Sequence, residues 1–266
     1  MDMHPPIETG ATASRRPVAG VGRVLLWSGG SLWIGRQAGR VERHAHHAVQ
    51  ITLALDASFR MRGDAADWHE HHGAIVMPHH AHQFDGCGHA VVHLFVEPEA
   101  APGRVLLQRH ASTAIADLPR DIVDALVRPL RHAHAQRAHD ETLVALARQA
   151  IAELAGPAPA PGSVDPRIGR SIAWVRQRLD APLSLADAAA VAHLSPSRFR
   201  HLFVAQTGIS FRAYLLWARV ETAVAAAMAG QSWTAAAQHA GFADSAHLSR
   251  TCRRMFGIAP ATLVRE

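Results

Sequence analysis

The chain has 266 residues, of which 48% are hydrophobic and 18% charged, and its formal net charge is +5. This length allows two domains with separate cores, and the absence of an apolar run of about 18 residues excludes a membrane span. Two cysteines are too few for a disulfide framework or a thiolate metal cage. Residues 1–20 lack the apolar stretch of a signal peptide, so we expect a mobile arm on a cytoplasmic protein.

Residues 21–100 contain short apolar runs separated by Gly, Asp and Pro. This pattern is typical of strands in a small sandwich or barrel. The predicted strands cover residues 24–27, 31–34, 49–55, 73–77 and 91–96.

Residues 101–155 change to a helical pattern, with apolar residues such as Leu126, Leu130 and Leu143 spaced along one face. Two amphipathic helices between 104 and 155 are predicted, and they can pack on the barrel or on a second subunit. The following residues 156–162 hold three prolines and two glycines and cannot continue a helix. We therefore predict a semi-rigid linker over 156–166 and a domain boundary there.

Residues 167–266 contain one helix-turn-helix pattern twice. The two copies begin at Leu185 and Trp233, which are 48 residues apart, and end at Gly208 and Gly257, which are 49 apart. A tandem repeat of such a unit is typical of a transcription regulator, and a long helix over 210–229 is expected to join the copies.

Local signals define the ends of these helices. Ser184 and Asp187 have the spacing of a capping box, and Ser195 precedes a proline as an N-cap should. Gly208 and Gly257 occupy positions where a left-handed residue ends a helix. The second helix of each unit is therefore predicted to begin near 196 and 245.

Helical periodicity predicts the side chains that face outward from these second helices. Arginine on such a face can donate two hydrogen bonds to guanine, so Arg200, His201 and Arg250 are predicted to contact bases or flanking phosphates. Arg253 and Arg254 are predicted to bind the DNA backbone. The alternative for any one of these outward arginines is a solvated surface charge without a DNA contact. The full predicted DNA-binding set is Ser197, Arg198, Arg200, His201, Ser245, Ala246, Arg250, Arg253 and Arg254.

The basic charge is concentrated in the same part of the chain. Residues 167–266 hold 12 arginines against five acidic residues, a balance of +7, whereas residues 1–166 hold 15 against 17, a balance of −2. Such a surface suits a polyphosphate partner, because neutralised phosphates release condensed counterions.

Residues 167–264 resemble the DNA-binding domain of AraC-type transcriptional regulators, through residues 185–192, 194–199, 240–250 and 256–260. The resemblance implies two helix-turn-helix units that place their second helices in successive major grooves of promoter DNA. Because both units lie on one chain, an asymmetric DNA site is expected. The expected partners are double-stranded promoter DNA, a small-molecule effector, RNA polymerase and a second copy of the chain in a homodimer.

Eleven of the 20 histidines lie between residues 44 and 93. His44 and His46 would share one face of a strand, and His82 follows a proline and lies on a later strand; together they resemble the metal-binding motifs of cupin barrels. AraC-type regulators often carry a cupin-like sensing domain, and this resemblance covers residues 21–100. The expected fold is α+β, with a cupin-like barrel and a helical connector before an all-α DNA-binding domain.

Three interpretations of these histidines stay open. They can bind a divalent metal such as Zn, Ni or Fe, for which the candidate ligands are His44, His46, His82 and His93. The favoured alternative is a pocket for a small organic effector, lined by His44, His46, Gln50, Trp68, His82 and Phe84. The third is that they are half-buried strand residues and surface polar groups without a ligand.

The chain is therefore expected to be an effector-responsive regulator and not an enzyme. One alternative is a metal-dependent cupin enzyme fused to a DNA-binding module, although Gln50 stands where such enzymes usually supply a glutamate ligand. A DNA-alkylation sensor would need partner cysteines that Cys87 lacks. An architectural DNA binder without an effector is the remaining alternative.

Overall fold

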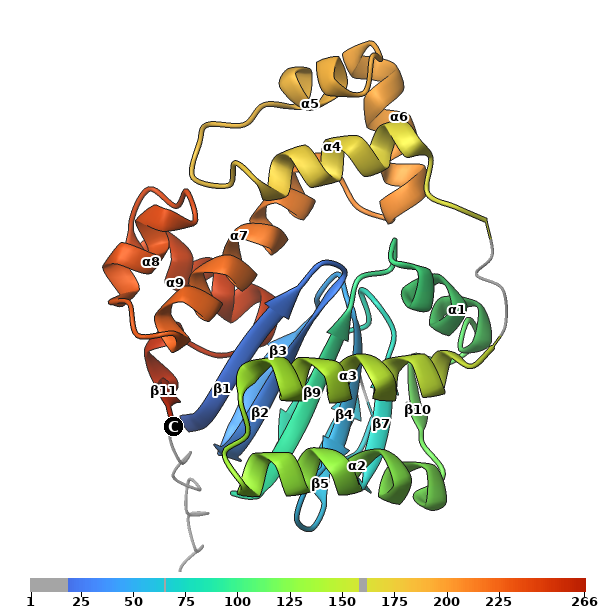
Figure 1. Cartoon of the computed structure of the whole chain (residues 1–266), viewed down its shortest axis with the longest axis vertical. Coiled ribbons are helices and arrows are strands. Elements are labelled where there is room, and N and C mark those ends of the chain that lie inside the picture. Colours follow the sequence, from blue (N-terminus) through green and yellow to red (C-terminus); the bar gives the residue numbers. More distant parts are fainter. Residues whose placement is uncertain (1–18, 65, 158–161) are drawn as a thin grey trace, which may run out of the picture.

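The computed structural model describes residues 19–64, 66–157 and 162–266. It confirms the α+β expectation: a sheet-rich N-terminal part is followed by a helical C-terminal part (Figure 1). Most of the expected arm, residues 1–18, lies outside the described residues, as do residues 158–161 of the expected linker. Residues 19 and 20 belong to the first strand instead of the arm, because they pair with a neighbouring strand.

The described strands form two sheets. The larger sheet has the order β10-β7-β4-β9-β2-β1-β11 and the smaller one the order β3-β8-β5-β6. The strands of the larger sheet are β1 (Ala19–Trp27), β2 (Gly30–Ala38), β4 (Val49–Ala54), β7 (Gly73–Val76), β9 (Ala90–Val96), β10 (Ile115–Asp117) and β11 (Leu263–Arg265). Those of the smaller sheet are β3 (Arg40–His44), β5 (Phe59–Gly63), β6 (His69–His71) and β8 (His82–Asp85).

All five strands expected over 21–100 are present, and they form the middle of the larger sheet. The strands of the smaller sheet were not among those five ranges, although strands were expected at His44 and at His82, where β3 ends and β8 begins. They contain three to five residues and many histidines and arginines, so they lack the apolar run that makes a strand recognisable. Hydrogen bonding between these strands forms the smaller sheet, which covers the barrel interior.

Both faces of the larger sheet are buried, and alternate side chains serve different cores. On β9, Val92 and Leu94 pack against the helices that cover the outer face, whereas Val91 and Phe95 point into the space between the sheets. The same alternation places Gln50, on β4, on the interior side, opposite to its apolar neighbours. The barrel interior therefore receives both aromatic and polar side chains.

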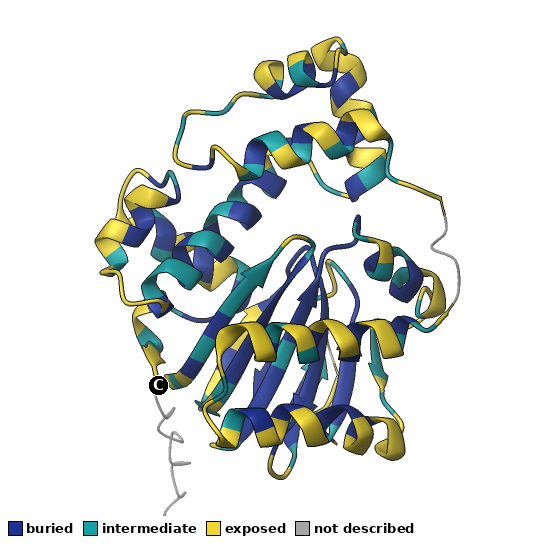
Figure 2. Cartoon of the chain, viewed as in Figure 1, coloured by how far each residue is buried: buried dark blue, intermediate teal, exposed yellow. Residues whose placement is uncertain are grey.

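Three helices follow the barrel strands, not two as expected. They are α1 (Ala101–Arg109), α2 (Arg120–Ala135) and α3 (Asp140–Ala155), and β10 lies between α1 and α2. The extra helix begins with Pro102 in its first turn, where a missing N–H costs nothing. Helices α2 and α3 cover the outer face of the larger sheet, and their outward sides are largely exposed (Figures 1 and 2).

Among the described residues the C-terminal part has six α-helices, followed by a short 3-10 helix (η1, Pro260–Thr262) and β11. The α-helices are α4 (Pro166–Arg176), α5 (Leu185–Val191), α6 (Pro196–Thr207), α7 (Phe211–Met228), α8 (Trp233–His239) and α9 (Ser245–Phe256). The expected capping box is present, since Ser184 and Asp187 each accept a backbone hydrogen bond from the other. Gly208 and Gly257 adopt the left-handed conformation as predicted. No helix in the described ranges has the length and apolarity needed to cross a membrane.

The helical part packs directly against the barrel. Trp217 of α7 and Phe256 of α9 belong to the same core as Trp33 and Phe95 of the larger sheet, and the Trp33 and Phe256 rings stack with centroids 4.8 Å apart. In addition, β11 pairs in parallel with β1, so the end of the chain extends the barrel sheet (Figure 1). The first helix-turn-helix unit has a separate core, whereas the second shares its core with the barrel.

Two glycines that end helices allow a matched test of this packing. A methyl group at Gly257 would collide with the Glu42 carbonyl oxygen and lie 2.6 Å from Val41, whereas one at Gly208 has no neighbour nearer than 3.8 Å. Both residues have positive φ, so alanine introduces backbone strain of about 1 kcal/mol in each case.

We expect Gly208→Ala to lower the free energy of unfolding by about 1 kcal/mol, and Gly257→Ala by about 2 to 4 kcal/mol, because the second substitution also overpacks the interface. Urea unfolding of both variants and the parent measures the difference. Equal losses would show that α9 is not held against β3.

Candidate nucleic-acid interface and buried histidine cluster

The predicted DNA-binding residues lie on the outer faces of α6 and α9. All nine are exposed, while residues expected to face inward, such as Phe199, Leu248 and Cys252, are buried. Figure 2 shows the same division, with the outer faces of both units largely exposed. The helical periodicity thus predicted the orientation of both helices correctly.

The arginines on these faces have no competing partners within the described residues. None of Arg200, Arg250 and Arg254 forms a salt bridge with a carboxylate of the described chain. By contrast, Arg219 donates to the carbonyl oxygens of Leu179 and Ala181, and so it supports the fold. Only the three-dimensional structure distinguishes arginines that are free to bind DNA from those that support the fold.

One outward histidine is oriented by its own helix. The Nδ1 atom of His201 lies 2.9 Å from the carbonyl oxygen of Ser197, to which it donates a hydrogen bond. The other ring nitrogen, Nε2, then carries the lone pair of the neutral ring. His201 can therefore accept a hydrogen bond from a base amino group, or donate to a phosphate when protonated.

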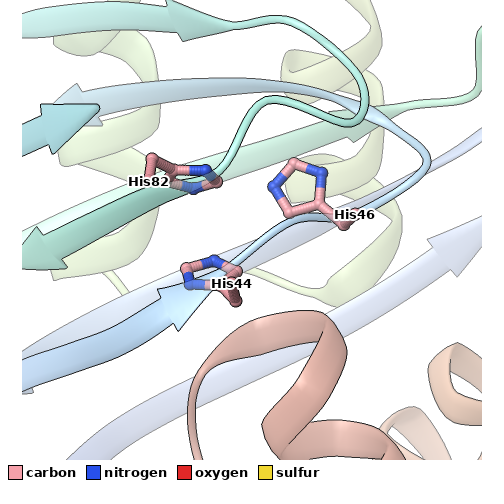
Figure 3. Close-up of side chains that lie close together, drawn as sticks. All are labelled: His44, His46 and His82. Carbon is pink, nitrogen blue, oxygen red and sulfur yellow. The ribbon is translucent and has the colours of Figure 1, made fainter. Parts of the chain in front are cut away.

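Inside the barrel, three histidines point toward one another (Figure 3). His44 ends β3, His46 lies in the loop that follows, and His82 begins β8. Their candidate ligand atoms lie within 4.8 Å of one another, and all three side chains are buried. His46 was expected to share a strand face with His44; instead β3 ends before it, and the loop brings it to the cluster.

Backbone carbonyls determine which ring nitrogens of the cluster are available. The Nδ1 atoms of His44 and His82 donate to the carbonyl oxygens of Glu42 and His80, at 2.8 and 3.0 Å. This leaves both Nε2 lone pairs for a ligand, and that of His82 is buried without a hydrogen-bond partner. Burial, followed by its histidine neighbours, holds the pKa of His44 well below its usual value. Neutral imidazole is the form that binds metal.

His46 differs because Gln50 occupies its second nitrogen. Its Nδ1 atom donates to the Ala48 carbonyl oxygen at 2.9 Å, and its Nε2 atom lies 2.8 Å from the Gln50 side-chain amide. Burial and the nearby His82 lower the pKa of His46 to about 3, which favours the neutral ring. Gln50 faces His46 with its Oε1 atom and donates its amide N–H to the Thr52 hydroxyl at 2.8 Å, so it must rotate away before His46 can bind a metal.

Two of the other residues assigned to this site, His93 and Trp68, lie outside the group of three histidines. His93 lies outside the cluster, since its Nδ1 atom is 3.0 Å from the Thr52 hydroxyl oxygen. Trp68 lies between the guanidinium groups of Arg40 and Arg62, each 5.2 Å from its ring centroid.

Phe84 does line the interior, beside His44 and His93, but the cavity there has a volume of only about 40 Å³. Such a volume holds one or a few waters, whereas organic ligands occupy roughly 300 to 1,000 Å³. Phe256 of α9 and Phe95 help to fill the space. The favoured interpretation, an organic effector inside the barrel, therefore lacks room in this arrangement.

A buried charge network connects the barrel with the helical part. Arg176, at the end of α4, forms an ion pair with Glu97 beyond β9, and its Nη2 atom lies 3.5 Å from a Glu221 carboxylate oxygen. Arg176 also donates to the Tyr214 hydroxyl at 3.0 Å, and Ser31 donates to Glu221 at 3.2 Å. Burial raises the pKa of Glu221 despite the neighbouring guanidinium. Sequence patterns did not indicate this network, because its five members come from four distant segments.

Comparison with known proteins agrees with the helical part. Residues 188–266 match the helix-turn-helix domain family. An 88-residue segment is 32% identical to LumQ of Photobacterium leiognathi, which is named as a probable transcriptional regulator. This segment is 33% of the present chain and spans 36% of LumQ, about a third of its length.

Solved structures with the same overall fold include ToxT from Vibrio cholerae. One ToxT structure covers 92% of this chain and 94% of its own, with a TM-score of 0.54 at 10% identity. Another, with an unsaturated fatty acid bound, covers 92% of each chain with a TM-score of 0.52. These similarities identify residues 188–266 as a helix-turn-helix domain and show that the chain shares its overall fold with ToxT.

Proposed function

We propose that the protein is a transcription regulator that binds double-stranded promoter DNA through α6 and α9 and responds to a small-molecule effector. The observation that carries this proposal is the exposure of all nine predicted contact residues on two helix-turn-helix units, with the arginines free of carboxylate partners in the described chain. Unpaired guanidinium groups can bind phosphates without first breaking an internal ion pair.

The length of α7 supports simultaneous binding of both units. This helix has 18 residues, which corresponds to a length of about 27 Å. The reading helix α6 precedes it in the chain, and the reading helix α9 follows it after α8. Successive major grooves on one side of the duplex are roughly 34 Å apart. One chain could therefore contact two grooves, and an asymmetric DNA site is expected.

Selection of duplexes from a random library, followed by footprinting, tests this proposal. We expect an asymmetric protected site covering two adjacent major grooves, with an affinity that falls steeply as salt rises. Failure to enrich any sequence would contradict sequence-specific binding. A strictly palindromic site with one helix engaged per chain would contradict the two-groove arrangement.

The effector half of the proposal draws on the ToxT fold similarity and on the packing of the second unit against the barrel. ToxT has been crystallised with an unsaturated fatty acid, so this fold accommodates a small organic ligand in that protein. Here α9 shares a core with the barrel, and a ligand that altered this core would shift the position of the second unit. The homodimer and the RNA polymerase contact stay predictions.

A second candidate function is divalent-metal sensing by His44, His46 and His82. The orphaned Nε2 atom of His82 favours it, since a buried nitrogen without a partner is costly unless a ligand occupies it. Zn, Ni and Fe all suit imidazole, and a bound ion would supply positive charge beneath α9. The residues fit such an ion after rotation of Gln50, which releases His46.

Metal content provides a direct test. After incubation with zinc and removal of excess metal, we expect about one zinc per chain, measured by mass spectrometry, and a loss of most of it in His82→Ala. His69→Ala is the matched control, because that histidine is exposed on β6. Equal zinc in His82→Ala and in the parent would contradict the site.

A further inference from the structure

One side chain on the outer face of α6 is apolar and exposed. The described residues include four exposed large apolar side chains, and Val204, which is 41% exposed, is the one of these that lies on a reading helix. The buried face of α6 is formed by Phe199, Phe203 and Thr207, and Val204 takes no part in the core of the first unit. Its apolar surface is therefore free to contact a partner.

Val204 lies within the predicted DNA-contacting face of α6. At about 100° per residue it falls between Arg200 and His201 around the helix axis, about 40° from the first and about 60° from the second. It also follows Arg200 by one turn, which is about 6 Å along the axis. A duplex whose major groove is contacted by Arg200 therefore faces Val204 as well.

The second unit carries an arginine at the equivalent position. Gly208 and Gly257 end the two reading helices and are 49 residues apart, so Val204 corresponds to Arg253. Both side chains are exposed. An arginine at this position suits a phosphate, whereas a valine gains nothing from phosphate and offers only apolar surface to the groove. The two units thus present different chemistry at one position of the repeat.

The thymine C5 methyl group is the apolar group that base pairs present in the major groove. The other groups presented there are hydrogen-bond donors and acceptors, which a valine cannot satisfy. Contact between Val204 and a thymine methyl group removes apolar surface from water. Burial of one methyl group corresponds to a gain of about 4-fold in affinity.

We propose that Val204 packs against the methyl group of a thymine in the major groove and makes the DNA site selective for thymine at that position. This inference concerns the specificity of the proposed DNA interface, and so it rests on the proposed function. One helical turn of about 6 Å corresponds to about two base-pair steps of roughly 3.4 Å. The thymine is therefore expected about two base pairs from the base pair that Arg200 contacts.

Replacement of each thymine in the selected site by deoxyuridine, one at a time, tests the contact, because this change removes only the methyl group. We expect one thymine at which the replacement weakens binding of the parent chain about 4-fold in gel-shift titrations. The base pair read by Arg200 is located in the same assay, as the position at which Arg200→Ala no longer distinguishes guanine from other bases. Absence of a sensitive thymine within about three base pairs of that position would overturn the proposal.

Val204→Ala assigns the contact to this side chain. The variant should bind the unsubstituted site about 4-fold more weakly than the parent, and deoxyuridine at the sensitive position should then cost less than about 2-fold, because the partner of the methyl group is already gone. Val21→Ala is the matched control: that valine is 43% exposed on β1, and the variant should keep the full response to deoxyuridine. An unchanged response in Val204→Ala would assign the methyl contact to another residue and overturn the proposal.

Val204→Arg copies the second unit and provides an independent readout. This variant should lose the response to deoxyuridine, and the slope of log affinity against log salt should steepen by about 0.9, as expected for one further phosphate contact. A full response to deoxyuridine in Val204→Arg would contradict the apolar contact.

The same measurements separate this inference from the proposed function. Failure to enrich any DNA sequence would reject both. Sequence-specific binding that depends on Arg200 but responds to no deoxyuridine would retain the regulator and reject the role of Val204.

Discussion

Replacing Arg200 or Arg250 by alanine should weaken binding to the selected DNA site by roughly 10- to 100-fold each, while leaving the fold intact. Both side chains are exposed and have no carboxylate partner in the described chain, so their removal disturbs no internal contact. A bidentate contact between arginine and guanine contributes about 1 to 3 kcal/mol of discrimination. Gel-shift titrations on the selected site and on a scrambled duplex measure the loss.

The two duplexes distinguish base contacts from phosphate contacts. A base-contacting arginine should lose affinity mainly for the selected site, whereas Arg253→Ala should weaken binding to both duplexes and reduce the salt dependence. Arg128→Ala, exposed on α2 and far from either unit in the sequence, is the matched control and should change neither affinity. Unaltered DNA binding in both Arg200→Ala and Arg250→Ala would remove these helices from the interface.

Replacing Arg176 by methionine should lower the free energy of unfolding by about 3 to 5 kcal/mol. The substitution keeps much of the aliphatic volume but leaves Glu97 and Glu221 buried without their cation, and an uncompensated buried charge is strongly destabilising. Most of this loss of stability comes from the carboxylates that stay buried without a cation, and less of it comes from the lost ion pairs themselves. Urea unfolding followed by tryptophan fluorescence measures it.

A partial rescue tests this cause. Adding Glu221→Gln to the Arg176→Met variant removes one stranded charge and should restore part of the lost stability, since a neutral amide can still accept from Ser31. Arg178→Met, an exposed position two residues further along, should change stability by less than about 0.5 kcal/mol. A double variant no more stable than Arg176→Met would show that the stranded charge is not the source of the loss.

The helical part could be predicted closely from the sequence. Helix ends depend on a few neighbouring residues, so the Ser184 capping box, the Ser195 N-cap and the left-handed Gly208 and Gly257 all appear where local rules place them. The outward faces of α6 and α9 followed from the 3.6-residue period alone. The expected joining helix over 210–229 differs from α7 by one residue at each end.

The barrel could be predicted only in outline. Strands with a continuous apolar run were recognised, and strands were expected at His44 and His82. The limits of β3 and β8, and β5 and β6 altogether, depend on pairing with distant partners. For the same reason the sequence predicted that the histidines cluster, but it did not predict which contacts each histidine makes. Gln50 turns out to hold His46, and His93 is bound to Thr52 instead of joining the other three.

Local chemistry thus sets the helix ends and the outward faces of the two reading helices, because each depends on residues within one or two turns of the chain. Contacts between remote segments set everything that connects the two parts: the Arg176 network and the filling of the barrel by Phe256. These features bury charge and aromatic rings at one interface. The energies of these contacts depend on which remote groups meet at the interface, and local sequence patterns do not predict which groups meet.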